Sequence, residues 1–294
     1  MKPEGNVKIQ IIVFLLIVFA LTILVSIFWS RVPDPREKEA MFGFLVMWSP
    51  AVAAVFTCLV FQRNLHGIGW KLGKAKYLAL SYALPLLVGL VTYSIIWLTG
   101  AGRFAWVKPF ATNTCGIVGI KNPSYTVAFP LMLTLGLLLR LLFALGEEIG
   151  WRGFLVPRLA KLFSLKTAAL ASGVIWAAYH LPGLLFLYYY SGSRLKSVLF
   201  FSLMAISASV IMFWIRLKSG SMWTGAVFHA SHNLAIQGIF NHFTLEKANT
   251  NFFAGEFGLG LAVVYTLVAF WFWKRLNQVK IDHPSRNSQP TLKD

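Results

Sequence analysis

Long apolar segments alternate with short polar segments along most of the chain, beginning close to the N-terminus. A helix of about 20 apolar residues is long enough to cross a bilayer. The first segment is too long for the apolar region of a signal peptide, and no small-residue cleavage site follows it, so we expect a retained span. We predict an all-α fold, a polytopic membrane bundle of about eight transmembrane helices, over about 9–29, 41–61, 77–98, 127–155, 167–187, 195–215, 222–240 and 259–273.

The composition is that of a membrane-embedded chain. Of its 294 residues, 57% are hydrophobic and 13% are charged, whereas about 25% are charged in a typical soluble protein. In a soluble protein the net charge of +17 would suggest a nucleic-acid partner. Here the basic residues lie between apolar spans, so we expect the lipid bilayer, and no nucleic acid, as a partner. With only two cysteines, Cys58 and Cys115, a disulfide framework and a cysteine-rich zinc site are excluded.

The basic residues also predict the orientation in the membrane. Eight spans place both termini on one side, and that side holds 17 of the 27 Lys and Arg residues against 9 on the other. Because loops rich in Lys and Arg stay in the cytoplasm, we expect an integral, multi-pass protein of the cytoplasmic (plasma) membrane with both termini cytoplasmic. Residues 1–273 then form a single transmembrane domain, and residues 274–294 form a polar cytoplasmic tail.

Ionisable residues are rare within the predicted spans and gather in the second half of the chain. The span 127–155 holds Arg140, the adjacent Glu147 and Glu148, and Arg152. A charged side chain at the bilayer centre costs at least about 2.5–3.5 kcal/mol, so the default interpretation is a functional site in an intramembrane polar cavity. We expect Arg140 to be paired or to reach toward the membrane surface, outside that site.

The two adjacent glutamates have different sequence neighbours. Glu148 and Arg152 stand four residues apart in the favourable acid-then-base order. We predict that they form a buried supporting pair, with a simple helix-packing ion pair as the alternative. Glu147 has no evident local partner, and it is therefore the better candidate for proton transfer.

Histidines and an asparagine on later spans complete the candidate set. His180 lies on the span 167–187. On the span 222–240, His229 and Asn233 are four residues apart and face the same way, as two donors to one oxyanion would. His232 faces away from that stripe, and we expect it to pack or to cap. A carboxylate, a histidine and two donors together suit the hydrolysis of an amide bond.

Three motifs in these spans resemble those of the CAAX protease and bacteriocin-processing (CPBP) family, intramembrane endopeptidases that include the type II CAAX prenyl proteases. The first motif is E-E-I-G-W-R-G-F-L at 147–155. The second is an aromatic residue, often Phe, placed four positions before a histidine, and Trp176 and His180 match it. The third, a histidine four positions before Asn or Asp, is matched by His229 and Asn233.

The resemblance covers about 141–236, within a motif-bearing core at 125–240, and the N-terminal third carries no matching motif. It implies an eight-helix bundle with a polar cavity open to the cytosol. It also implies a peptidase acting on protein or peptide substrates at the membrane. It implies that Glu147 and His180 activate the attacking water. Glu148 and Arg152 would support the first motif, and His229 and Asn233 would stabilise the oxyanion.

The cofactor remains open between none and zinc. The family is often labelled metalloprotease, yet its motifs also suit a metal-free, glutamate-dependent reaction. The sequence lacks the His-Glu-x-x-His zinc helix. A zinc site could still be assembled from His180, His229 and Glu147.

Two further functions are alternatives. The first is a non-catalytic membrane protein of the same fold, such as an immunity or scaffold protein. The second is a proton-coupled transporter, since intramembrane Glu and His can relay protons. Transporters usually consist of repeated halves, whereas here every intramembrane charge falls in one half of the chain. The substrate, its prenylation and the oligomeric state are not specified by the sequence.

Overall fold

The computed structural model describes residues 3–31, 43–105, 112–186 and 189–279, and these are almost entirely helical. The predicted loop after Arg31, the start of the second span before Gly43 and the tail after Val279 lie outside the described residues. The elements, of which η2, η3 and η4 are π-helical, are α1 (Pro3–Arg31), α3 (Gly43–Gln62), α4 (Ala75–Leu98), β1 (Arg103–Phe104), α5 (Thr112–Ile117), α6 (Tyr125–Leu131), η2 (Met132–Gly136), α7 (Leu137–Glu148), η3 (Ile149–Leu155), α8 (Val156–Leu162), α9 (Leu165–Phe186), α10 (Arg194–Ser219), α11 (Trp223–Asn233), η4 (Leu234–Phe240), β2 (Thr244–Leu245), α12 (Thr250–Phe253), α13 (Leu259–Arg275) and η5 (Leu276–Gln278).

Seven of the described helices are long and apolar enough to cross a membrane, which confirms a polytopic all-α bundle. They are Asn6–Trp29, Gly43–Gln62, Ala75–Leu98, Tyr125–Leu162, Leu165–Phe186, Arg194–Ser219 and Leu259–Gln278. The predicted span 222–240 is not among the seven. It is formed by α11 and η4, whose residues are mostly buried. Because other helices surround this pass, it can carry polar side chains that a lipid-facing helix could not.

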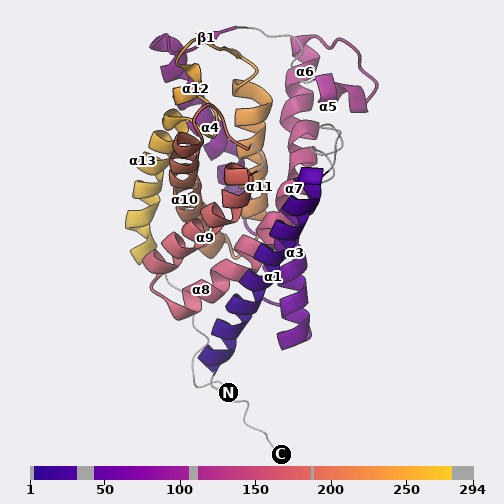
Figure 1. The fold of residues 1–294 in the computed structure, drawn as a ribbon, viewed down its shortest axis with the longest axis vertical. Coiled ribbons are helices and arrows are strands. Elements are labelled where there is room, and N and C mark those ends of the chain that lie inside the picture. Colours follow the sequence, from indigo (N-terminus) through magenta and orange to yellow (C-terminus); the bar gives the residue numbers. More distant parts are fainter. Residues whose placement is uncertain (1–2, 32–42, 106–111, 187–188, 280–294) are drawn as a thin grey trace, which may run out of the picture.

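The bundle has two distinct ends. At the first, which we call the terminal end, the start of α1 meets α8 and α9 meets α13: Arg158 Nε donates to Gln10 Oε1 at 2.8 Å, and Lys166 Nζ lies 5.7 Å from the Trp273 ring centre. At the other, the distal end, β1 pairs antiparallel with β2. Figure 1 shows the start of α1 and β1 at opposite extremes of the molecule. Both the first and the last described helices thus have their outer ends at the terminal end.

The motif-bearing helix continues without a break from Tyr125 to Leu162 through α6, η2, α7, η3 and α8. Its predicted end near Leu155 was therefore wrong. Pro157 does not stop the helix; it lies where the π-helical η3 passes into α8. The two glutamates lie at the end of α7 and inside this long helix, as the sequence analysis required.

Two glycines bring this helix against α3. A Cβ added at Gly146 would lie 2.6 Å from the Met47 carbonyl oxygen, and one added at Gly150 would lie 2.4 Å from Pro50 Cβ. Only a residue without a side chain permits such an approach, as small-residue faces do between membrane helices. The contact fixes the position of the intervening Glu147 and Glu148 relative to α3.

Candidate active site

Three helical segments carry the motif side chains to one cavity of about 560 Å³. The motif residues that line it are Glu147, Trp176, His180, His229 and Asn233. They come from α7, α9 and α11, and α11 packs directly against α7. The four residues predicted as catalytic therefore share one cavity wall, although up to 86 positions separate them in the chain.

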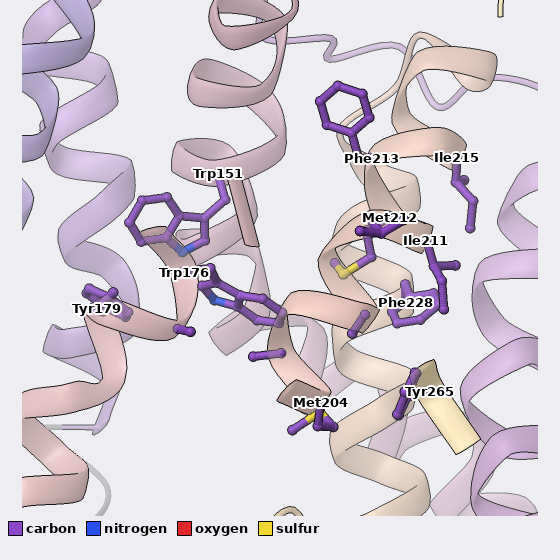
Figure 2. Packing of buried hydrophobic residues seen from close by; sticks show 14 of the residues in the cluster. Trp151, Trp176, Tyr179, Met204, Ile211, Met212, Phe213, Ile215, Phe228 and Tyr265 are labelled. Atoms are coloured by element: carbon purple, nitrogen blue, oxygen red, sulfur yellow. The ribbon is translucent and has the colours of Figure 1, made fainter. Parts of the chain in front are cut away.

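Glu147 is held by two tryptophans. Its Oε2 accepts a hydrogen bond from Trp176 Nε1 at 2.7 Å and one from Trp151 Nε1 at 3.1 Å. The expectation that Glu147 lacks a local partner was therefore wrong, because Trp151 stands one helical turn after it. Figure 2 shows the Trp151 and Trp176 side chains beside each other, with Tyr179 close by. Both indoles bind the same oxygen, so Oε1 is left for another partner.

Glu148 and Arg152 form the predicted pair behind the cavity wall. Glu148 Oε1 lies 2.9 Å from Arg152 Nη1, and both side chains are fully buried. Arg152 also stacks over the Trp176 ring, with 4.4 Å between the guanidinium carbon and the ring centre. Neither member of the pair lines the cavity. The geometry thus agrees with a supporting position.

Glu148 also holds a histidine, which the sequence did not predict. The same Oε1 lies 3.1 Å from His229 Nδ1. A carboxylate only accepts hydrogen bonds, so Nδ1 carries the proton and donates a hydrogen bond to Glu148. The other ring nitrogen, Nε2, is then the one free to meet a ligand, and its role depends on the charge of the ring. A neutral His229 offers a lone pair at Nε2, and an imidazolium offers an N–H.

His180 is oriented by its own helix. Its Nδ1 lies 2.8 Å from the backbone oxygen of Trp176, one turn earlier. Because a carbonyl oxygen only accepts, Nδ1 bears the proton, and Nε2 of the neutral ring is an acceptor. The ring packs edge-on against Tyr179 and, from the other side, against Phe201 at 4.8 Å between ring centres. His180 is thus fixed with its basic nitrogen available.

The cavity lining also includes a histidine and a glutamate outside the predicted set. His232 lines it, with Nδ1 2.9 Å from the Tyr265 hydroxyl and Nε2 3.7 Å from Glu256 Oε1. His232 thus packs on Tyr265 and also borders the cavity that His229 and Asn233 line. Glu256 lies between α12 and α13, and the sequence analysis missed it altogether. Its acidic side chain next to an apolar span was the one available signal.

Arg140 lies apart from the cavity, as expected. Its Nη1 donates to the carbonyl oxygen of Gly136 at 3.1 Å. Its guanidinium also lies against Gly238 of η4, where an added Cβ would be 2.8 Å from Nη2. The side chain is half-buried and is not part of the cavity lining.

The proposed zinc ligands do not gather into a metal site. In the part of the chain that the structure describes, no three His, Cys, Asp or Glu side chains are grouped so that they could hold a metal ion. The residues present therefore do not fit a zinc ion bound by His180, His229 and Glu147.

Part of the chain matches a known protein family. Residues 129–235, which include all three motifs, match the family model described as type II CAAX prenyl endopeptidase Rce1-like. No curated protein matches the chain. The matched segment extends from α6 through α11 into the start of η4 and so contains every motif residue that lines the cavity. The match covers about a third of the chain and supports the CAAX protease and bacteriocin-processing family that the three motifs indicated.

Proposed function

We propose that the protein is an intramembrane endopeptidase that hydrolyses peptide bonds of membrane-associated proteins or peptides. The observation that carries the proposal is the convergence of Glu147, His180, His229 and Asn233 on one cavity. The buried Glu148–Arg152 pair behind this wall supports it by fixing the position of His229.

Glu147 and His180 activate the attacking water in this proposal. Glu147 Oε1, the oxygen not bound by the indoles, accepts one proton of the water. His180 Nε2 accepts a hydrogen bond from the same water and orients it. General bases positioned in this way contribute about 10²–10⁴-fold to a rate. Protonated Glu147 then delivers its proton to the amine that leaves.

His229 and Asn233 stabilise the negative charge that develops on the scissile carbonyl oxygen. The Asn233 side-chain amide is a donor in every state. His229 donates through Nε2 only as an imidazolium, and the Glu148 carboxylate at 3.1 Å compensates that positive charge. Donors directed at a developing oxyanion are worth about 2.7–4 kcal/mol each.

The direction from which substrate enters follows from the two ends of the bundle. Besides the motif residues, the cavity lining includes Ser26 near the end of α1, Gly43 at the start of α3, and Glu256. The cavity therefore extends toward the distal end. Toward the terminal end, Arg216 closes the structure by donating from Nε to the Arg152 carbonyl oxygen at 2.8 Å and from Nη2 to the Ile68 carbonyl oxygen at 3.3 Å. This arrangement argues against cytoplasmic termini combined with a cavity that is open to the cytosol.

We infer that the termini are cytoplasmic and that the cavity faces the opposite side of the membrane. The excess of Lys and Arg at the terminal end supports this orientation. Cysteines replacing exposed Ser124 at the distal end and exposed Ser164 at the terminal end would test it. In intact cells, a membrane-impermeant maleimide should label Ser124→Cys but label Ser164→Cys only after permeabilisation. The reverse pattern would overturn the orientation.

A cleavage assay tests the peptidase proposal. The purified protein in detergent should cleave a fluorogenic peptide library, and Glu147→Gln should lower the rate about 10²–10⁴-fold. Glu246→Gln removes an exposed glutamate outside the cavity and should leave cleavage unchanged. Activity should survive chelator treatment. Loss on chelation with recovery on adding zinc would contradict the metal-free mechanism. A folded protein without cleavage of any peptide would favour the non-catalytic scaffold.

A further inference from the structure

A second carboxylate faces the cavity from the wall nearest the distal end. Glu256 is 7% exposed and lines the cavity. Its Oε2 accepts a hydrogen bond from the Tyr189 hydroxyl at 2.8 Å, and its Oε1 accepts one from Gln237 Nε2 at 2.6 Å. His232 Nε2, at 3.7 Å, is too far for a hydrogen bond and has no other partner among the described residues.

The surroundings keep Glu256 ionised. Burial opposes the charge, but the nearby His232 and hydrogen bonds from Tyr189 and Gln237 outweigh it and lower the pKa of Glu256 to about 2. A carboxylate has about four lone-pair sites, and the tyrosine and glutamine use two of them. Glu256 is therefore a carboxylate with acceptor capacity left over.

The side chains that line the cavity differ in charge. Among the described residues, no Lys or Arg lines it, whereas two carboxylates, Glu147 and Glu256, do. Glu147 stands at the catalytic wall with its charge held by two indoles. Glu256 has no task in the mechanism above. Tyr189 and Gln237 leave part of its acceptor capacity facing a cavity that no described Lys or Arg lines, so a ligand that brings a cation would gain from this position.

We propose that Glu256, with Tyr189, Gln237 and His232, forms a subsite that binds a cationic side chain, Lys or Arg, of the peptide substrate. This inference rests on the proposed peptidase function. The protonated amine or guanidinium would bind the free lone pairs of Glu256. The apolar stem of the same side chain would pack on Phe201 and Met204, which also line the cavity.

Gln237 lies four residues after Asn233 of the oxyanion pair, on the helical path from α11 into η4, and both residues line the cavity. The subsite therefore shares one cavity with the catalytic residues, and we expect the preferred cation close to the scissile bond.

The test measures binding apart from cleavage. In the inactive Glu147→Gln background, a fluorescent peptide would be titrated in detergent, with Lys or its neutral analogue norleucine placed in turn at each position. The Lys peptide should bind about 10–100-fold more tightly at one position, as expected for a charge-assisted contact. Adding Glu256→Gln should abolish this preference, while adding Glu246→Gln, the exposed control, should preserve it.

The outcomes separate this inference from the proposed function. Equal binding of Lys and norleucine peptides at all positions would overturn the subsite, even if the wild-type protein cleaves peptides. A Lys preference without any cleavage by the wild-type protein would uphold the subsite and overturn the peptidase. If Glu256→Gln does not fold, Glu256→Asp keeps the charge and should keep a reduced preference. Loss of binding to Lys and norleucine peptides alike in a folded Glu256→Asp variant would mean that Glu256 only supports the fold.

Discussion

The buried pair of Glu148 and Arg152 makes the sharpest prediction, because its two members cost far more to remove singly than together. Both side chains are fully buried, and their atoms are 2.9 Å apart. Arg152→Met leaves the Glu148 carboxylate without its cation, and Glu148→Gln leaves the guanidinium without its anion. Removing one partner of a buried ion pair destabilises proteins by about 3–5 kcal/mol. We expect each single variant to lose this much free energy of unfolding.

The double variant Glu148→Gln/Arg152→Met removes both charges and keeps similar volumes. Neutral replacement of a buried pair is often close to neutral for stability. We therefore expect a coupling energy of about 3 kcal/mol or more in the double-mutant cycle. Unfolding would be followed by tryptophan fluorescence while a denaturing detergent is titrated into mild micelles. Lys247→Met, which removes an exposed contact to the Gly100 carbonyl oxygen, should change the unfolding free energy by no more than about 1 kcal/mol.

Activity gives the same cycle a second readout. Because the Glu148 carboxylate, 3.1 Å from His229 Nδ1, compensates the charge of the His229 imidazolium and a neutral amide does not, the double variant should be folded and still inactive. Stability recovered without activity would identify Glu148 as a positioning residue that acts through His229. Additive losses in the two single variants would refute the buried-pair reasoning. Full cleavage activity in the double variant would refute the role of Glu148 in holding His229.

Two other predictions concern the packing and the hydrogen bonds of the first motif. Gly150→Ala should lower the unfolding free energy by about 1–3 kcal/mol, because the added methyl group overpacks against α3. Gly116→Ala is the control and should not lower it, since nothing lies within 4 Å of a Cβ at that position. Equal effects of the two substitutions would contradict the close approach of the helices. Trp176→Phe removes the 2.7 Å hydrogen bond to Glu147. The substitution should lower the unfolding free energy by about 1.5–3 kcal/mol. It should reduce cleavage without abolishing it, because Trp151 still donates a hydrogen bond to Glu147. Unchanged stability would show that the hydrogen bond from Trp176 contributes little.

Most of the fold could be predicted from hydropathy because the membrane allows few structures. A spanning segment must satisfy its own backbone hydrogen bonds, so a long apolar run can be read as a helix. The pass 222–240 shows where the criterion weakens. It crosses the bundle between the terminal and distal ends but is shielded by other helices, and its histidines lower its hydropathy. The end of the motif-bearing helix was also missed, since proline disfavours a helical conformation of the residue before it but does not always end a helix.

Oppositely charged partners one helical turn apart could be predicted, whereas the bond from Trp151 to Glu147 at the same spacing was missed, and contacts between helices could not be predicted. Glu148 and Arg152 could be paired from their spacing alone. The bond from Trp176 to Glu147 joins residues 29 positions apart, and sequence spacing holds no trace of it. Glu256 was missed for the same reason, because only the tertiary fold brings the α12–α13 connection to the cavity.

The adjacency of Glu147 and Glu148 now has a physical account. Consecutive residues on a helix point about 100° apart, so two neighbouring carboxylates cannot serve one ligand from the same side. Each instead meets a partner one turn later: Glu147 binds Trp151 and Glu148 binds Arg152. Trp151 is a neutral donor, so it leaves the negative charge of Glu147 directed at the cavity. Arg152 is a cation, and it neutralises the charge of Glu148, which is turned away from the cavity. A single pair of consecutive acids thus provides one carboxylate that lines the cavity and one that is paired with Arg152 and holds His229.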